Sequence, residues 1–154
     1  MYIESSVISY ITARPSRDIV VSARQTITVE WWEEYRSTFD TFISELVIEE
    51  IGSGDIIAAK MRLSLVEKIP VLIATENAKI LAKALLVENA VPESSTEDAL
   101  HISIAAVQNI DFLLTWNFRH INNANTREKI SKVIAELDYT CPVLCSPEEL
   151  INEK

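Results

Sequence analysis

Glycine is nearly absent from this chain of 154 residues, which contains only Gly52 and Gly54. Glycine-rich loops that cradle phosphates, such as G-x-G-x-x-G and the P-loop, cannot be written with two glycines placed this way. The sequence therefore excludes the classes of nucleotide-binding protein whose phosphate site is built on such a loop.

Positive charge and cysteine are also scarce. Lys and Arg number 14 against 23 Asp and Glu, which gives a formal net charge of −9. Proteins that attract nucleic acid through broad electrostatics are usually basic, so any nucleic acid must be bound locally, through metal ions and a few cations. Cys141 and Cys145 have no second pair at zinc-ligand spacing, and we interpret them as small apolar residues flanking a strand.

Long apolar runs are missing as well. The longest uncharged run, residues 99–110, is too short to span a bilayer. Glu4 interrupts any apolar region at the start, so no signal peptide is visible. These features predict a cytoplasmic protein without membrane association. The length and the hydrophobic fraction of 48% predict one globular domain over residues 1–154.

Extended and helical patterns alternate along the chain. Strands are predicted at residues 2–4, 38–44, 111–115 and 143–145, with a small extended segment at 71–74. Helices are predicted over residues 7–12, 16–39, 45–51, 55–67, 75–89, 95–109 and 124–137. This alternation predicts an α/β fold with a parallel sheet flanked by helices.

Four apolar segments each end in a carboxylate or carboxamide. Glu4 closes the strand predicted at 2–4, and Asn117 follows the strand predicted at 111–115. Glu50 lies in the helix predicted over 45–51, and Asp98 lies in the first turn of the helix predicted over 95–109. Parallel sheets bind ligands at the edge where their strand ends gather, so these side chains are expected to converge. Clustered carboxylates repel one another unless they hold a cation, here Mg²⁺ or Mn²⁺. The pattern is typical of a phosphodiester-cleaving metal site.

Two of these acids also have structural interpretations. On a helical wheel Glu50 lies between Leu46 and Val47 in the apolar arc, where an unpaired carboxylate is costly. It could instead sit at the rim and reach solvent. Asp98 fits the third position of a capping box begun by Ser95, although it faces the apolar side of its helix. Capping and metal binding can coexist there.

The residues around them leave further alternatives open. Asn117 follows a strand and could be a turn former rather than an oxygen ligand or water-positioning group. His101, one turn after Asp98, could move protons or be a structural histidine. Arg119 and His120 lie where a substrate phosphate would approach.

These segments, in this order, resemble the PIN domain family, most closely its bacterial VapC-type toxin branch. The resemblance covers nearly the whole chain and is carried by residues 2–9, 44–51, 98–102, 114–120 and 142–147. It implies a three-layer α/β/α sandwich with a central parallel sheet and a ribonuclease activity that depends on Mg²⁺ or Mn²⁺.

The resemblance also implies roles for particular residues. Glu4, Glu50, Asp98 and Asn117 become the catalytic and metal-binding residues. Ser6 and Thr115 become the side chains that fix carboxylate orientation. The implied partners are an RNA substrate and an antitoxin protein. Surplus apolar residues in the helices at 16–39 and 55–67 predict a homodimer.

The chain departs from the family pattern at two positions. The first acid is usually Asp and here is Glu4, and the fourth is often Asp and here is Asn117. Octahedral Mg²⁺ tolerates misplaced ligands poorly. A non-catalytic PIN-fold binding or regulatory module, with weak or no nuclease activity, is therefore the alternative function.

Overall fold

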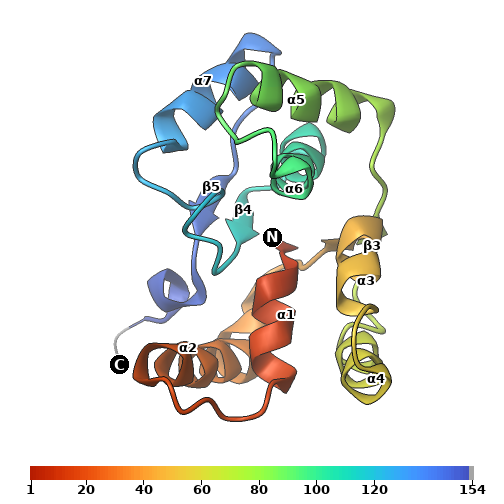
Figure 1. The fold of residues 1–154 in the computed structure, drawn as a ribbon, viewed down its shortest axis with the longest axis vertical. Helices are drawn as coiled ribbons and strands as arrows, with labels where there is room; N and C mark the ends of the chain where they lie inside the picture. Colours follow the sequence, from red (N-terminus) through yellow and green to blue (C-terminus); the bar gives the residue numbers. More distant parts are fainter. Residues whose placement is uncertain (153–154) are drawn as a thin grey trace.

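Short parallel strands alternate with helices in the computed structural model, which describes residues 1–152 (Figure 1). The strands are β1 (Tyr2–Ile3), β2 (Ile43–Ser44), β3 (Val71–Leu72), β4 (Phe112–Leu114) and β5 (Val143–Cys145). The α-helices are α1 (Ser5–Thr12), α2 (Ile19–Glu30), α3 (Glu45–Ile51), α4 (Ile56–Leu65), α5 (Glu76–Val87), α6 (Thr96–Val107) and α7 (Arg127–Glu136). The predicted α/β class with parallel strands is confirmed.

The strands form two small parallel sheets, one ordered β1-β4-β5 and the other pairing β2 with β3. In the larger sheet Tyr2 lies opposite Leu113 and Ile3 opposite Leu114. A parallel bridge between Tyr2 and Phe42 adjoins the smaller sheet, and the Ile3 N–H donates to the Phe42 carbonyl at 2.9 Å. The residues that follow β1 and β4 are thereby brought side by side.

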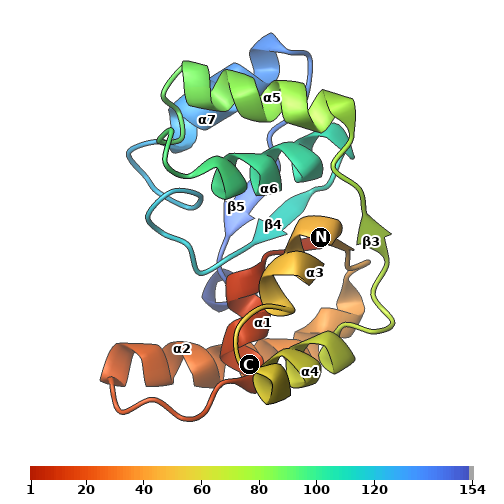
Figure 2. The same cartoon turned by 45° about the vertical axis from the view of Figure 1, so that its right-hand side comes forward.

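Helices lie on both sides of the strands. Figure 1 shows α5, α6 and α7 on one side of β4 and β5, with α1 to α4 on the other, and the turned view in Figure 2 agrees. Leu113 and Leu114 of β4 are fully buried, as expected of a parallel strand covered on both faces. No helix within residues 1–152 has the length and apolar character needed to cross a membrane.

The helix predicted over 16–39 begins later, at Ile19, and changes type in its second half while remaining helical to Thr38. Helix α2 ends at Glu30, and a π-helical turn (Trp31–Tyr35) and a 3₁₀ turn (Arg36–Thr38) follow. The Trp31 side chain is fully buried, with its ring 6.2 Å from that of Phe39 between centroids. A π-turn carries an extra residue per turn, and here it accompanies the burial of this large ring.

Two neighbouring boundaries also differ from prediction. The strand expected over 38–44 is confined to β2, because Thr38 belongs to the 3₁₀ turn and only Phe42–Ser44 run beside other strands. Helix α1 begins at Ser5 rather than Val7, with Glu4 as its N-cap residue. Glu4 is thus held between the end of a strand and the start of a helix.

Candidate metal centre

Glu4 occupies the junction between β1 and α1 and is 6% exposed. Its Oε2 accepts hydrogen bonds from Ser6 Oγ at 2.5 Å and from Thr115 Oγ1 at 2.8 Å. Thr115 directly follows β4 and is fully buried, so the pairing of β1 with β4 places it beside Glu4. Among residues 1–152 no cationic side chain pairs with Glu4. A buried carboxylate held only by hydroxyls is a strong candidate to bind a cation.

Glu50, in the last turn of α3, has two donors on one oxygen. Its Oε1 accepts from Ser5 Oγ at 2.8 Å and lies 2.5 Å from His101 Nε2. Burial acts to raise the pKa of Glu50, but the hydrogen bond from His101, electrostatic attraction to His101 and the hydrogen bond from Ser5 together outweigh it and hold the pKa below the ordinary value. The side chain is 34% exposed, yet its carboxylate is paired with interior groups rather than extended into solvent.

A chain of hydrogen bonds runs from Glu50 into the core. His101, on α6, is fully buried, and its Nδ1 lies 2.6 Å from the Tyr2 hydroxyl. That hydroxyl is 2.7 Å from Ser44 Oγ, which accepts the Val47 N–H at the start of α3. Burial raises the pKa of Tyr2 far above its ordinary value, so the phenol keeps its proton.

The Glu50 carboxylate determines which atom donates in each of these hydrogen bonds. An ionised carboxylate only accepts hydrogen bonds, so His101 donates from Nε2, and the neutral ring with its proton there accepts the Tyr2 hydroxyl at Nδ1. Ser44 then donates to Tyr2. Each buried polar atom has a partner in this arrangement, and all donors point toward the Glu50 carboxylate.

Glu4, Glu50 and His101 form a compact group of possible metal ligands. One ligand atom from each lies within 4.8 Å of the others. The two carboxylates together offer a charge of −2, which suits a divalent ion. His101 Nε2 donates to Glu50 in this arrangement, so His101 orients that carboxylate and has no lone pair free for the ion. The donor set fits the divalent metal that the family resemblance implies.

Asp98 lies beside this group rather than within it. Burial raises the pKa of Asp98 above its ordinary value, and the negative charge of Glu4 adds to the shift, against the lowering effect of an Asn117 hydrogen bond. The Asn117 Nδ2 donates to Asp98 Oδ1 at 3.0 Å. The predicted capping box is wrong, because the Ser95 side chain makes no cap hydrogen bond.

Asn117 acts as a turn former and as a partner of Asp98. Its Oδ1 accepts the backbone N–H groups of Arg119 at 3.2 Å and His120 at 2.9 Å. The amide therefore presents its nitrogen to Asp98, while the oxygen assigned to a metal by the sequence prediction is taken up by the turn. In this arrangement Asn117 contributes to the site by its hydrogen bond to Asp98.

An open pocket of about 520 Å³ gives access to the site between α3 and the start of α6. Four acidic side chains line it: Glu49, Glu50, Glu97 and Asp98. Glu50 and Asp98 thus face the same space, although Asp98 is not one of the three grouped residues.

A scan of the chain against protein-family models found no match, and a search of curated proteins found none either. The function is therefore inferred from the chemistry of the site. Sequence analysis missed Tyr2 and Ser5 and left His101 between two roles. The only sequence signal for His101 was its position one helical turn after Asp98.

Proposed function

We propose that this chain is a divalent-metal-dependent ribonuclease of PIN-like fold that hydrolyses RNA phosphodiester bonds. The proposal rests on the surroundings of Glu4, a buried carboxylate. Its partners among residues 1–152 include no cation, and one of its oxygens lies near possible ligand atoms of Glu50 and His101. An acidic site of this kind attracts a divalent ion, and metal-assisted hydrolysis is the chemistry that such an ion supports.

The topology supports this position for a site. If the Tyr2–Phe42 bridge joins the two sheets, the strand order is β3-β2-β1-β4-β5, all parallel, between two layers of helices. In this order the chain adds β2 and β3 on one side of β1 and then β4 and β5 on the other side. Open α/β sheets bind ligands at the carboxyl ends of the two strands between which the strand order reverses in this way, here β1 and β4. Glu4 and Thr115 follow those two strands. We propose the three-layer α/β/α sandwich on these grounds.

Each side chain has a definable part in the proposed reaction. Glu4 and Glu50 would hold the ion, with Asp98 as the nearest further ligand. A bound Mg²⁺ or Mn²⁺ supplies an activated water and offsets charge on the phosphate. Ser6 and Thr115 orient Glu4, while Ser5 and His101 orient Glu50. Asn117 orients Asp98.

Exposed apolar side chains on two helices are the basis for proposing protein partners. Large apolar side chains are exposed on α2 and α4, with Ile19 at 84% and both Ile56 and Ile57 at 73%. Helices α2 and α4 both pack against α1, and exposed apolar side chains on them suit protein contacts, which supports a homodimer and an antitoxin partner. We therefore propose that the ribonuclease is the cytoplasmic toxin of a toxin–antitoxin pair, with the antitoxin as its protein partner.

Cleavage of a mixed RNA panel tests the proposal. We expect the purified protein to cut RNA with Mn²⁺, to stop when the ion is chelated, and to lose activity when Asp98→Asn is introduced. Metal binding by the wild type without cleavage of any RNA would reject the nuclease in favour of the non-catalytic module. The hydrogen bond from Asn117 to Asp98 favours that second function, because it engages an oxygen that a catalytic ion would need.

A further inference from the structure

Arg24 of α2 is stacked on two aromatic rings of the loop that follows β4. Its guanidinium carbon lies 5.5 Å from the Trp116 ring centre and 5.1 Å from that of Phe118. The two rings meet edge to face at 5.9 Å. Trp116 is buried, and its indole N–H donates to Thr28 Oγ1 at 2.8 Å, which fastens the loop to α2. Phe118 is 36% exposed.

The Arg24 guanidinium has all its donors free. It makes neither a hydrogen bond nor an ion pair with any residue in the range 1–152, whereas Arg62 donates to two backbone carbonyls and Arg127 to the Asn122 side chain. A guanidinium carries five N–H donors in a planar fork that matches phosphate oxygens. Contact with the two rings holds the guanidinium in place, so less conformational entropy is lost when it binds an anion.

The stack is joined directly to the metal centre. The Trp116 backbone N–H donates to Ser6 Oγ at 2.9 Å, and the same hydroxyl donates to Glu4. Asn117, between the two aromatic residues, holds Asp98. A ligand bound on Phe118 would therefore lie next to the carboxylates.

Charge selects what this surface can bind. The chain carries −9, and acidic side chains line the pocket between α3 and α6, so phosphates are repelled from that side. Arg24 is partly exposed and Arg119 is exposed; neither lines that pocket, and neither forms an ion pair within the described part of the chain. An anionic substrate would approach here.

We infer that Arg24, Phe118 and Arg119, which we call the Arg24 ledge, bind one nucleotide of single-stranded RNA beside the metal centre. The base stacks on Phe118, and its phosphate accepts hydrogen bonds from Arg24 and Arg119. Bases inside a duplex are already stacked on their neighbours and cannot offer a free face, so the ledge selects single strands. This inference rests on the proposed function and adds the form of its substrate.

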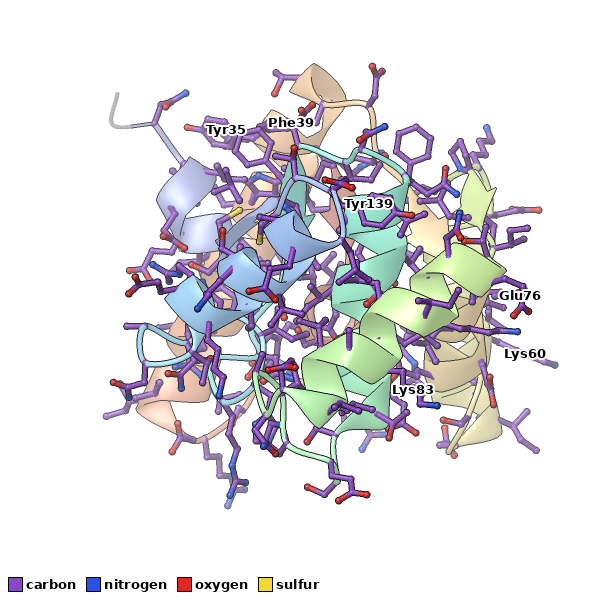
Figure 3. All side chains as sticks on the ribbon, turned by 90° about the horizontal axis from the view of Figure 1, so that it is seen from above. Tyr35, Phe39, Lys60, Glu76, Lys83 and Tyr139 are labelled. Carbon is purple, nitrogen blue, oxygen red and sulfur yellow. The ribbon has the colours of Figure 1, made fainter. Side chains whose placement is uncertain are left out.

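Fluorescence anisotropy with a short labelled single-stranded RNA, in the presence of a chelator, tests the ledge without cleavage. We expect Phe118→Ala and Arg24→Ala each to weaken binding about tenfold, as is typical for the loss of one stacked base or one bidentate contact. Arg24→Lys keeps the charge but loses the planar fork, so it should also bind more weakly. Lys83→Ala is the matched control, since Lys83 is an exposed cation on α5 (Figure 3).

The outcomes separate the ledge from the metal site. Weakened RNA binding in the ledge variants, with Mn²⁺ affinity unchanged in calorimetry, supports the inference. Unchanged RNA binding in Phe118→Ala and Arg24→Ala, with Mn²⁺-dependent cleavage intact, overturns the ledge and leaves the nuclease in place. Equal weakening by Lys83→Ala also overturns it, because the contact would then be non-specific. If Phe118→Ala unfolds, Phe118→Leu keeps apolar bulk and removes only the stacking face.

Discussion

Tyr2 is a single residue on which several buried polar atoms depend. Its hydroxyl bridges His101 Nδ1 and Ser44 Oγ at 2.6 and 2.7 Å. We expect Tyr2→Phe to lower the free energy of unfolding by about 1–3 kcal/mol, because two buried groups lose their partner. Urea titration at neutral pH measures this. Tyr10→Phe is the control, since Tyr10 also packs on an aromatic ring.

The same substitution bears on metal binding. His101 orients the Glu50 carboxylate, and partners that orient a ligand typically contribute about 10- to 100-fold to metal affinity. Tyr2→Phe should therefore weaken Mn²⁺ binding in calorimetry. A variant with wild-type stability and wild-type Mn²⁺ affinity would mean that the hydrogen-bond chain has no part in the site.

Asn117→Asp tests the fourth position of the family pattern. It would replace an amide donor to Asp98 with a second carboxylate at about the same place. Like charges at this distance repel, so the metal-free variant should melt at a lower temperature at pH 7. Added charge should also raise Mn²⁺ affinity. Thermal melts with and without Mn²⁺ check both effects, and a variant with neither would show that Asn117 is only a turn residue.

Helix α6 places Asp98 in its first turn, partly buried and close to the charge of Glu4. Its raised pKa means that the charged form destabilises the fold at neutral pH, and that this cost disappears as pH falls and the carboxyl takes up a proton. We expect Asp98→Asn to melt at or above the wild-type temperature at pH 7 without metal. The difference should shrink toward acidic pH.

A second measurement on the same variant tests the metal site. Asp98→Asn should lose or strongly reduce Mn²⁺ binding, because a charged ligand is replaced by an amide. Unchanged Mn²⁺ affinity would remove Asp98 from the ligand set and leave Glu4 and Glu50. A lower melting temperature that persists at every pH would contradict the assigned pKa shift.

Helix α3 has the opposite dependence on pH. The pKa of Glu50 is held below its ordinary value, so its ionised form stabilises the fold above the ordinary carboxyl pKa, and this contribution is lost as pH falls through the lowered pKa. Glu50→Gln should therefore reduce stability at neutral pH and have less effect in acid. Chemical unfolding at several pH values measures the difference, and an effect independent of pH would contradict it.

Local pattern was enough to predict much of this arrangement at the level of elements. Apolar periodicity identified the helices, and the inward position of Glu50 followed from the wheel of α3. The contact between Tyr2 and His101 joins residues 99 positions apart, so only the packing of α6 against the strands creates it. The π-turn at Trp31 and the amide orientation of Asn117 likewise depend on tertiary contacts that propensity does not encode.

The whole molecule carries a formal charge of −9, which limits how the proposed RNA substrate can be bound. If contact is confined to the Arg24 ledge, only about one phosphate is neutralised, and log affinity should fall against log salt with a slope near −0.7 for a single strand. Anisotropy titrations over a range of KCl concentrations measure this slope. A slope several times steeper would require a larger basic surface than Arg24 and Arg119 provide.

The central claim is that Glu4 and Glu50 hold a divalent ion at the ends of β1 and α3. Calorimetric titration of Mn²⁺ into wild type, Glu4→Gln and Glu97→Gln tests it most directly. Gln at position 4 can still accept the hydrogen bonds from Ser6 and Thr115, and Glu97 is an exposed acid of the same pocket. We predict binding by wild type and Glu97→Gln and its loss in folded Glu4→Gln. Equal binding by all three proteins, or none by wild type, would contradict the claim.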